Sequence, residues 1–374
     1  MSVITTQCFP PRMGGIENLV HALASALAAK GFAVEVFADG HGGAEEKAFD
    51  LAQPYPIWRV RGFKPWRRWW KARRLSQLIE TRQCTNVIAD SWKSLEHLEV
   101  VRHIPVVCLA HGSELPRQGI DRKARRIAAA YAKVTAVVAN SRNTLLRVIR
   151  FFPDSTRLHV IYPGVARPPP VSPVLSAQIT TELAGFAPKM ISVARLEPRK
   201  GIDSVLRVLP RLVQRYPQLL YLIVGDGSQR TALEEMVTTA GMQAHVRFIS
   251  AASDALRDGY LAASDLFVLP GRRVGDDVEG FGMAFVEAAW FALPALCGSA
   301  GGAAEAVVHE QTGLVCEGDD DESVYTAIDE LLRDDARRQA FGAQARLRAE
   351  DFLWERILGK YLVLLKKNIE DGAG

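Results

Sequence analysis

Residues 276–287 of this chain read Asp-Asp-Val-Glu-Gly-Phe-Gly-Met-Ala-Phe-Val-Glu, and this stretch decides how the rest of the sequence is interpreted. One apolar run ends at Pro270 and another begins near Pro294, so the pattern predicts a loop that leads into a helix between two strands. Glycines on both sides of Phe281 let the backbone approach a ligand closely, and the first helical turn has free N–H groups. The stretch therefore predicts a binding site for a hydroxyl-rich or anionic ligand.

Two glutamates of this stretch, Glu279 and Glu287, are candidates for binding a long ligand at two points. Glu279 precedes the helix and Glu287 lies about two turns into it, so the two carboxylates cannot bind one substrate atom. An exposed helix face is the alternative interpretation of Glu287, because Glu is common in helices. Its neighbours, Phe-Val-Glu-Ala-Ala-Trp-Phe-Ala, favour a binding role, since a carboxylate in an apolar helix needs a partner or a ligand.

The spacing of Glu279 and Glu287 resembles the E-x7-E signature of retaining glycosyltransferases of the GT-B fold, family 4. The sequence Asp-Val-Glu-Gly-Phe-Gly is similar to the branch that includes the phosphatidylinositol mannosyltransferases. This resemblance implies that Glu287 binds the ribose of a nucleotide sugar and that Glu279 binds the sugar. It also implies that backbone groups contribute to the donor site at Gly280, Phe281, Gly282 and Met283.

A second candidate for phosphate binding follows the first predicted strand, residues 2–6. A loop with prolines and glycines leads there into a predicted helix over residues 16–30. A glycine turn at a helix N-terminus can bind phosphate, and a tight turn that simply requires glycine is the alternative. The run from Phe9 to Glu17 resembles the first loop of the family, which implies that the amides of Gly14 and Gly15 contact the donor diphosphate.

Three further side chains are candidates for the reaction. His111 follows a predicted strand over 106–109, where open parallel sheets bind ligands, although a lone histidine is more often structural. The motif His-Gly-x-Glu resembles the family's histidine near the donor sugar. Arg195 and Lys200 lie between a strand end and a helix start, where cations can hold a diphosphate. The pattern Arg-Leu-x-x-x-Lys-Gly resembles the family and assigns both to the diphosphate, while Arg199 is left without a role. With Glu279, these three are the expected catalytic residues.

The order of strands and helices predicts an α/β protein of two doubly wound domains. A proline-rich stretch at 167–176, expected to be extended, separates them. The resemblance implies the GT-B arrangement, with Rossmann-like domains facing a central cleft. Residues 1–165 would bind the acceptor and residues 166–354 the donor, and a C-terminal helix at about 355–370 would pack back on the first domain. Val165 is followed by Ala166, where the family commonly has Asp, so an acidic contact is absent there.

The net charge of +4 is divided unevenly along the 374 residues. Residues 1–165 contain 24 Lys and Arg against 13 Asp and Glu, whereas the remainder contains 22 against 29. A basic first half favours an anionic partner such as nucleic acid, an anionic lipid surface or a phosphorylated acceptor.

The basic excess is concentrated in residues 58–74, which carry eight Lys or Arg and four Trp and lie in an acid-free stretch from 51 to 79. Trp with Lys and Arg is typical of segments that lie at a membrane interface. Nucleic-acid binding and a solvated basic helix with its tryptophans in the core are the alternatives. The expected membrane or acceptor surface consists of Trp66, Arg67, Arg68, Trp69, Trp70, Lys71 and Arg74.

The family resemblance implies transfer of a hexose, with mannose from GDP-mannose favoured, to a hydroxyl of a lipid-linked or glycan acceptor with retention. Fixed donors would stabilise the leaving diphosphate. The only Asp-x-Asp run, at 319–321, lies in a late acidic loop, so we expect neither a metal ion nor a bound cofactor. A UDP-sugar donor with a soluble acceptor, a GT-B epimerase or phosphorylase, and a nucleic-acid-binding module are the alternatives.

The expected location is the cytoplasm, peripheral on the inner face of the cell membrane and without a nucleic-acid partner. No apolar run is long enough to span a bilayer, and no basic region precedes the first apolar residues. The five cysteines are scattered singly in or beside apolar runs, which indicates reduced core residues.

Overall fold

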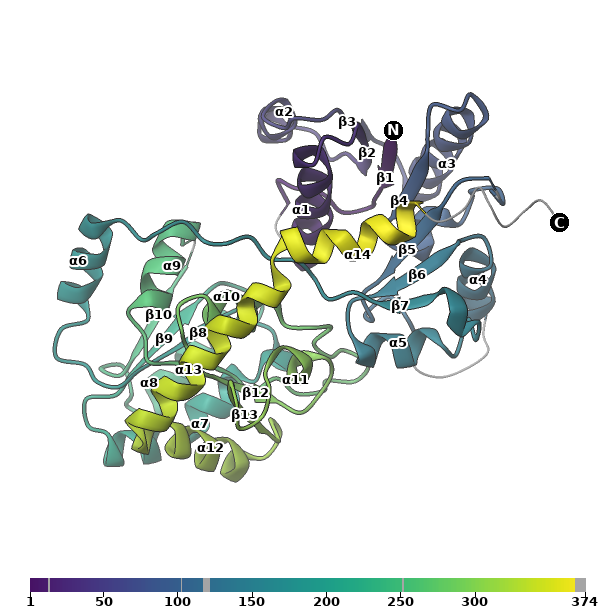
Figure 1. Ribbon diagram of the computed structural model, residues 1–374. Helices are drawn as coiled ribbons and strands as arrows, with labels where there is room; N and C mark the ends of the chain where they lie inside the picture. The colour runs from purple at the N-terminus through teal and green to yellow at the C-terminus, as the bar shows by residue number, and fades with distance from the viewer. Residues whose placement is uncertain (13, 102, 117–121, 251, 367–374) are drawn as a thin grey trace. The chain divides into compact units, whose positions relative to one another are not determined.

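The computed structural model describes residues 1–12, 14–101, 103–116, 122–250 and 252–366. The chain forms two compact units, one of Met1–Val165 with the C-terminal segment from Phe352, the other of Ala166–Asp351. Each unit has one parallel β-sheet with its own helices (Figure 1). The first boundary follows residue 165, and the second lies at Asp351 rather than at residue 354.

The first unit is built on a seven-stranded sheet of order β3-β2-β1-β4-β5-β6-β7, in which every pair is parallel. Its strands are β1 (Ser2–Thr5), β2 (Val34–Asp39), β3 (Ile57–Val60), β4 (Asn86–Ala89), β5 (Val106–Ala110), β6 (Ala136–Ala139) and β7 (Leu158–Val160). Its α-helices in the described ranges are α1 (Gly15–Ala29), α2 (Ala44–Leu51), α3 (Lys64–Glu80), α4 (Arg122–Tyr131), α5 (Arg142–Val148) and α14 (Trp354–Lys366). The strand order reverses at β1 and β4, so the loops after these strands leave the sheet at its switch point, where such sheets bind ligands.

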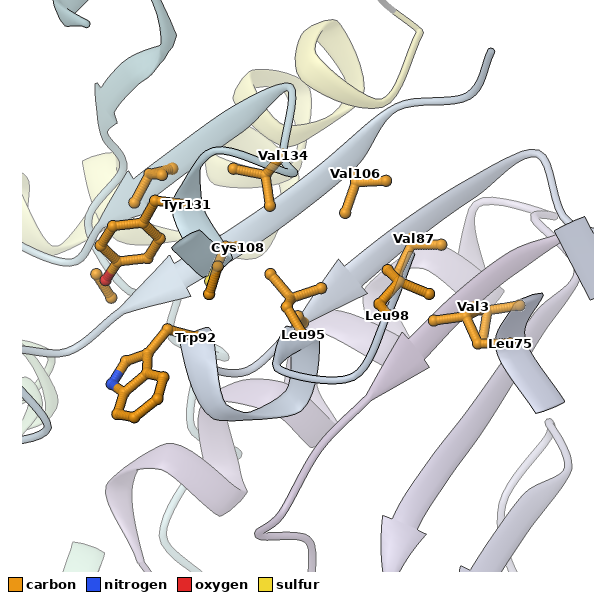
Figure 2. Packing of buried hydrophobic residues seen from close by; sticks show 14 of the residues in the cluster. Val3, Leu75, Val87, Trp92, Leu95, Leu98, Val106, Cys108, Tyr131 and Val134 are labelled. Atoms are coloured by element: carbon orange, nitrogen blue, oxygen red, sulfur yellow. The ribbon is translucent and has the colours of Figure 1, made fainter. Parts of the chain in front are cut away.

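Both faces of this sheet are buried, because successive strand residues point to opposite sides. On one face Val3, Val87 and Val106 pack against helical residues such as Leu75 and Tyr131 (Figure 2). On the other face the core is formed by strand residues together with α1 and α14. The near-continuous apolar strands are therefore those of a parallel sheet covered by helices on both sides.

Helix α14 joins the first unit through a close contact at Gly164. A Cβ at this glycine would lie 2.5 Å from the Trp354 ring, so only glycine lets the helix start pack there. Tyr361 is buried in the same core. The predicted C-terminal helix is thus present from Trp354 to Lys366, and residues 367–370 of the prediction lie outside the described residues.

The second unit has a six-stranded sheet of order β10-β9-β8-β11-β12-β13, again with every pair parallel. Its strands are β8 (Lys189–Val193), β9 (Leu220–Val224), β10 (Val246–Ile249), β11 (Leu266–Leu269), β12 (Ala295–Gly298) and β13 (Gly313–Cys316). Its α-helices in the described ranges are α6 (Pro173–Glu182), α7 (Ile202–Arg215), α8 (Arg230–Thr239), α9 (Asp254–Ala262), α10 (Met283–Ala289), α11 (Ala303–Ala306), α12 (Asp321–Arg333) and α13 (Asp335–Ala349). The switch point lies between β8 and β11, so the loops after these two strands emerge side by side.

The prediction of an extended linker is wrong for residues 173–176, which begin α6. Ser172 caps this helix, since its hydroxyl accepts a hydrogen bond from the Leu175 amide at 3.3 Å. Pro173 occupies the first helical position, where its missing N–H costs nothing. The prolines that suggested a stiff linker therefore include one that starts a helix.

Two further expectations concern membrane spans and cysteines. In the described part of the chain, no helix combines the length and the apolar character needed to cross a membrane. All five cysteines are free thiols, of which Cys84, Cys108, Cys297 and Cys316 are buried and Cys8 is partly buried. The prediction of core cysteines is therefore confirmed for four of the five, and Cys8 is only partly buried.

Candidate active site

The predicted donor residues of the second unit meet at the switch point of its sheet. The loop after β8 carries residues 194–201, and the loop after the adjacent β11 carries residues 270–282. Gly201 lies where these loops touch, in a left-handed conformation with φ of +71°, and a Cβ there would lie 2.1 Å from the carbonyl oxygen of Pro270. Glycine at this position therefore brings Lys200 beside the Glu279 loop.

The Glu279 carboxylate is held by two cations from the first of these loops. Arg199 donates from Nη1 to Oε2 of Glu279 at 2.8 Å, and Lys200 donates from Nζ to the same oxygen. Burial acts to raise the pKa of Glu279, but Lys200 and Arg199 act against it and hold the pKa below its ordinary value. Glu279 is therefore an anion at neutral pH.

Arg195 is linked to this pair through Glu197. Arg195 Nη1 lies 3.2 Å from Glu197 Oε1, and Arg199 Nη2 lies 2.9 Å from Glu197 Oε2. Arg195 is more exposed than Arg199 or Lys200. The structure thus brings Arg195, Lys200 and Glu279 together in one network.

Two members of this network, Arg199 and Asp277, have no role in the sequence-based prediction. Arg199 Nε lies 3.0 Å from Asp277 Oδ2, and Asp277 belongs to the same acidic stretch as Glu279. A third member, Glu197, was also missed. The alternation of charge in Arg-Leu-Glu-Pro-Arg-Lys was a signal for an ion-pair network, but its partners on the other loop could only be seen in the fold.

The loop after β12 holds the backbone of Glu279 in position. The Gly302 amide donates to the Glu279 carbonyl at 2.8 Å. Gly301 has a φ of +82°, and a Cβ there would lie 2.4 Å from the same carbonyl oxygen. This close packing places Glu279 independently of its side-chain partners.

The segment Gly280 to Met283 leads directly into α10. Gly282 precedes the helix with a φ of +86°, and a Cβ there would lie 2.6 Å from the Phe285 ring, so the turn needs glycine. Phe281 is buried, and its side chain therefore serves the core rather than a ligand. Sugar binding by the amides of Gly280, Phe281, Gly282 and Met283 stays a prediction.

Glu287 differs from Glu279 in having no partner. It lies half-buried on α10, and among the described residues it has neither a hydrogen-bond nor an ion-pair partner. Burial raises the pKa of Glu287, and the charge of Arg257 on α9 opposes this only in part. Such a carboxylate is suited to accept hydrogen bonds from ligand hydroxyls.

His111 lies at the carboxyl end of β5 in the first unit and is buried. Its Nε2 is 2.8 Å from the carbonyl oxygen of Asp90, and because a carbonyl only accepts, Nε2 carries the hydrogen. In the neutral ring Nδ1 is then the acceptor. Oε1 of Glu114 accepts a hydrogen bond from the His111 backbone amide at 2.9 Å, and this bond anchors the turn after the strand. A position near the donor sugar stays a prediction.

Asp90, at the end of β4, is a residue that the sequence analysis missed. Its Oδ2 accepts from the Gln7 amide at 2.8 Å and from the Thr6 hydroxyl at 3.0 Å. Its Oδ1 accepts from Ser94 at 2.6 Å. Asp90 therefore fixes the start of the loop that leads to Gly14 and Gly15.

Gly14 lies against the Glu17 side chain of α1. A Cβ at Gly14 would lie 2.2 Å from Oε2 of Glu17, so the carboxylate of α1 folds back over the glycine. Diphosphate binding by the amides of Gly14 and Gly15 stays a prediction, and it requires this carboxylate to leave room for an anion.

The expected membrane surface is wrong for Arg67, Arg68 and Lys71, which point into the first unit. Lys71 is only 1% exposed, and its Nζ donates to Asp39 Oδ1 at 2.6 Å and to the Thr6 carbonyl at 2.5 Å. Arg67 Nε lies 3.4 Å from the other oxygen of Asp39. Arg68 bonds to Gln7 and to Glu96, each at 3.1 Å. These cations therefore contact residues at the ends of β1 and β2 and are not available to a membrane surface.

The tryptophans of the same helix divide between core and surface. Trp70 is partly buried, with its ring 6.3 Å from that of Phe37. Trp66 and Trp69 are exposed and stack on each other at 5.2 Å. Arg74 is also exposed. Of the seven expected surface residues, Trp66, Trp69 and Arg74 therefore remain.

Comparison with known proteins agrees with this geometry. Residues 181–348 match the family model described as "Glycosyl transferases group 1", and residues 13–167 match "Glycosyltransferase Family 4". The chain is 31% identical over 356 residues to a GDP-mannose-dependent alpha-(1-6)-phosphatidylinositol monomannoside mannosyltransferase of Mycolicibacterium smegmatis, with 92% of each chain covered. The chain belongs to glycosyltransferase family 4.

Further similarities extend over nearly the whole chain. A GDP-mannose-dependent monoacylated alpha-(1-6)-phosphatidylinositol monomannoside mannosyltransferase of Corynebacterium glutamicum is 28% identical over 375 residues, with 96% of each chain covered. The crystal structure of Anabaena Alr3699/HepE with UDP and glucose matches with a TM-score of 0.78 at 20% identity, covering 98% of this chain and 99% of that one. A glycosyltransferase of Rickettsia africae matches with a TM-score of 0.79 at 17% identity and 99% coverage of both. The predicted GT-B fold and the predicted enzyme class are confirmed.

Proposed function

We propose that this family 4 glycosyltransferase transfers mannose from GDP-mannose to a hydroxyl of a lipid-linked acceptor with retention at the anomeric carbon. The relatives from Mycolicibacterium and Corynebacterium, which are named as GDP-mannose-dependent phosphatidylinositol monomannoside mannosyltransferases, support this donor and a phosphatidylinositol-based acceptor. The observation that carries the proposal is the pairing of Glu279 with Lys200 at the switch point, next to the unpaired Glu287. Together they provide cations for a diphosphate and carboxylates for hydroxyl groups.

Each side chain has a distinct part in the proposed reaction. The bond from the anomeric carbon to the diphosphate breaks, the bond to the acceptor oxygen forms, and the leaving phosphate takes the acceptor's proton. Arg195 and Lys200 stabilise the charge that grows on the diphosphate, which is the largest single contribution such a site can make. Glu287 binds the ribose hydroxyls, and Glu279 binds the mannose hydroxyls.

The positive charge at this edge of the second unit is supplied by Arg195, Arg199 and Lys200. In the described ranges, His, Cys, Asp and Glu side chains form no group of three that could hold a metal ion. We also propose that Arg195 and Lys200 stabilise the leaving group without a divalent metal, while Arg199 stays with Glu279. No bound cofactor is needed, because the nucleotide sugar is a co-substrate.

We further propose that the acceptor is reached at an anionic membrane surface on the cytoplasmic face. The supporting feature is a docking surface, defined here as the exposed side chains of the β3 and α3 region: Trp58, Arg61, Phe63, Lys64, Trp66, Trp69, Arg73 and Arg74. Four of these are large aromatic residues and four are cations. Indoles at headgroup depth and cations on lipid phosphates are the two components of interfacial binding.

The docking surface ends where acidic side chains begin. Glu80 and Glu99 line a groove of about 260 Å³ beside Trp69, together with His97. These carboxylates would repel lipid phosphates. The membrane contact is therefore expected along α3 up to Arg74, at the loop before it and at Trp58 on β3.

The donor is tested by supplying labelled GDP-mannose, UDP-glucose and ADP-glucose in turn to the purified protein with phosphatidylinositol mannoside in vesicles. We expect label to enter the lipid phase only from GDP-mannose, with GDP raising the melting temperature more than UDP or ADP. Transfer from a UDP-sugar alone, or to water-soluble acceptors alone, would contradict the proposal. Epimerised donor, or sugar phosphate formed from glycan and inorganic phosphate, would favour the alternative enzyme classes.

A further inference from the structure

We propose that Arg199 is a positioning residue for the reaction, which holds the Glu279 carboxylate in place when Lys200 turns from Glu279 to the donor diphosphate. This inference rests on the proposed function. It gives a role to the one cation of the Arg-Leu-Glu-Pro-Arg-Lys-Gly motif that the sequence left unassigned.

Arg199 is the centre of the ion-pair network at the switch point. Its three guanidinium nitrogens contact carboxylates on both loops: Nη2 that of Glu197 at 2.9 Å, Nε that of Asp277 at 3.0 Å and Nη1 that of Glu279 at 2.8 Å. Its backbone carbonyl accepts the Arg272 amide at 2.9 Å, so the main chain is held as well. The planar guanidinium is therefore held by ion pairs to three carboxylates, and Nη1 also donates a hydrogen bond to Glu279.

Lys200 differs from Arg199 in the number of its partners. Its ammonium group contacts Glu279 and no other carboxylate among the ion pairs of the described residues. Lys carries a compact charge on a flexible stem, whereas the Arg fork is pre-organised. Of the two cations on Glu279, Lys200 is therefore the one that can move to a new anion.

Among these ion pairs, cations and carboxylates are equal in number. Three cations, Arg195, Arg199 and Lys200, stand against three carboxylates, those of Glu197, Asp277 and Glu279. A diphosphate adds negative charge, and Lys200 and Arg195 are the cations assigned to it. Glu279 then depends on Arg199 to compensate its charge, because a buried carboxylate without a partner is strongly unfavourable.

The role of Arg199 is predicted to concern the sugar more than the nucleotide. Glu279 is assigned to the mannose hydroxyls, whereas the nucleotide is bound by Glu287 and the diphosphate by Lys200 and Arg195. Loss of Arg199 should therefore leave GDP binding intact and reduce the extra affinity that the mannose provides. A purely structural role would affect both ligands equally.

The test compares Arg199→Gln and Arg199→Lys with the control Arg272→Gln. Arg272 is a matched control, because its side chain is 17% exposed against 18% for Arg199 and pairs with Asp203 at 2.7 Å in the same unit. Titration calorimetry gives the affinities for GDP and GDP-mannose, and the pH dependence of kcat/KM gives the ionisation of Glu279. Melting temperatures of all variants show whether each is folded.

For Arg199→Gln we expect GDP affinity within about 2-fold of wild type and GDP-mannose affinity reduced by ~10-fold or more. The groups facing Glu279 are Lys200 and Arg199, with Asp277 and Glu197 behind Arg199. Because Arg199 helps to lower the pKa of Glu279, its loss moves the acid limb of the pH profile to higher pH. Arg199→Lys should restore part of both effects, and Arg272→Gln should show neither.

Parallel losses of GDP and GDP-mannose affinity, or an unchanged acid limb, would overturn the role of Arg199. Failure of the proposed function would look different. If wild-type protein binds UDP and a UDP-sugar instead, the donor proposal is wrong. The role of Arg199 is then decided by comparing the affinities of wild type and variant for UDP and for that UDP-sugar.

Discussion

At the scale of single residues, Glu279 and Glu287 lie eight positions apart but have opposite surroundings. Glu279 accepts from two cations, which hold its pKa below the ordinary value despite burial. Glu287 has no such partner, and burial raises its pKa. The first carboxylate is compensated within the protein, whereas the second has no hydrogen-bond or ion-pair partner among the described residues, and its proposed partner is a ligand. A strained electrostatic position of this kind is common at functional sites.

The change Glu287→Gln should weaken donor binding and stabilise the ligand-free protein against unfolding. Because the folded-state pKa of Glu287 is raised, its ionisation costs stability above its ordinary pKa, and the cost vanishes as the pH falls below that value. The amide removes this cost, so the ligand-free variant should melt about 2–4 °C higher than wild type at pH 7, as expected for ~1 kcal/mol. At acid pH the two proteins should melt at the same temperature. The donor KM should rise by ~10-fold. A donor KM equal to that of wild type would rule out the ribose assignment.

Replacing Lys200 or Arg195 with Ala should lower kcat by ~100-fold, more than it weakens substrate binding, because charge grows on the diphosphate in the transition state. Single-turnover and steady-state rates with GDP-mannose measure the two effects. Wild-type activity should survive EDTA. Abolition by EDTA with recovery on adding magnesium would show that a metal, and not these cations alone, stabilises the leaving group.

At the scale of elements, α3 shows what composition can and cannot predict. Its Trp and Lys/Arg content predicted a surface, and Trp66, Trp69 and Arg74 are exposed. Cations occur on both faces of the helix, however, and only the fold shows that Lys71 meets Asp39 at the end of β2. The partner that buries a charge lies far away in sequence, so the local pattern could not identify the inward face.

The docking surface is tested by sedimentation with vesicles. Lys64→Glu, Arg73→Glu and Arg74→Glu combined should abolish binding to anionic vesicles, since each cation near the membrane contributes about 1 kcal/mol. Trp66→Ala with Trp69→Ala should weaken binding in a way that salt does not reproduce. The control variant combines Lys30→Glu, Lys47→Glu and Lys360→Glu, which reverse three positive charges at other exposed positions of the first unit. This control should still bind anionic vesicles. Equal partition to neutral and anionic vesicles would exclude this mode of docking, as would loss of binding in the control.

The inward face of α3 should instead affect folding. Lys71→Met leaves Asp39 buried with Arg67 as its remaining cation, so the free energy of unfolding should fall by about 3 kcal/mol. Urea unfolding of this variant and of Arg74→Met, an exposed change on the same helix, measures the difference. A Lys71→Met protein as stable as Arg74→Met would mean that the buried ion pair contributes nothing.

At the scale of the whole molecule, two parallel sheets could be predicted because apolar strands alternate with helices along the chain. The predicted functional motifs follow such strands. The structure brings Arg195, Lys200 and Glu279 to one edge because the carboxyl ends of neighbouring parallel strands meet there, and their predicted roles toward the donor stay predictions. The network members Glu197, Asp277 and Arg199 were not assigned, since ordinary charged loops have the same composition. Helix α6 was missed because Pro173 was interpreted as a linker residue and not as the first residue of a helix.

The central claim is retention in mannosyl transfer from GDP-mannose to a lipid-linked acceptor. The most direct measurement is NMR of the product formed by purified protein from GDP-α-mannose labelled at the anomeric carbon and phosphatidylinositol mannoside in anionic vesicles. The account predicts one new signal with the carbon–proton coupling of an α-mannoside, which should form ~100-fold more slowly with Lys200→Ala. A β-mannoside, or unchanged donor in the presence of active, folded protein that uses another sugar nucleotide, would contradict it.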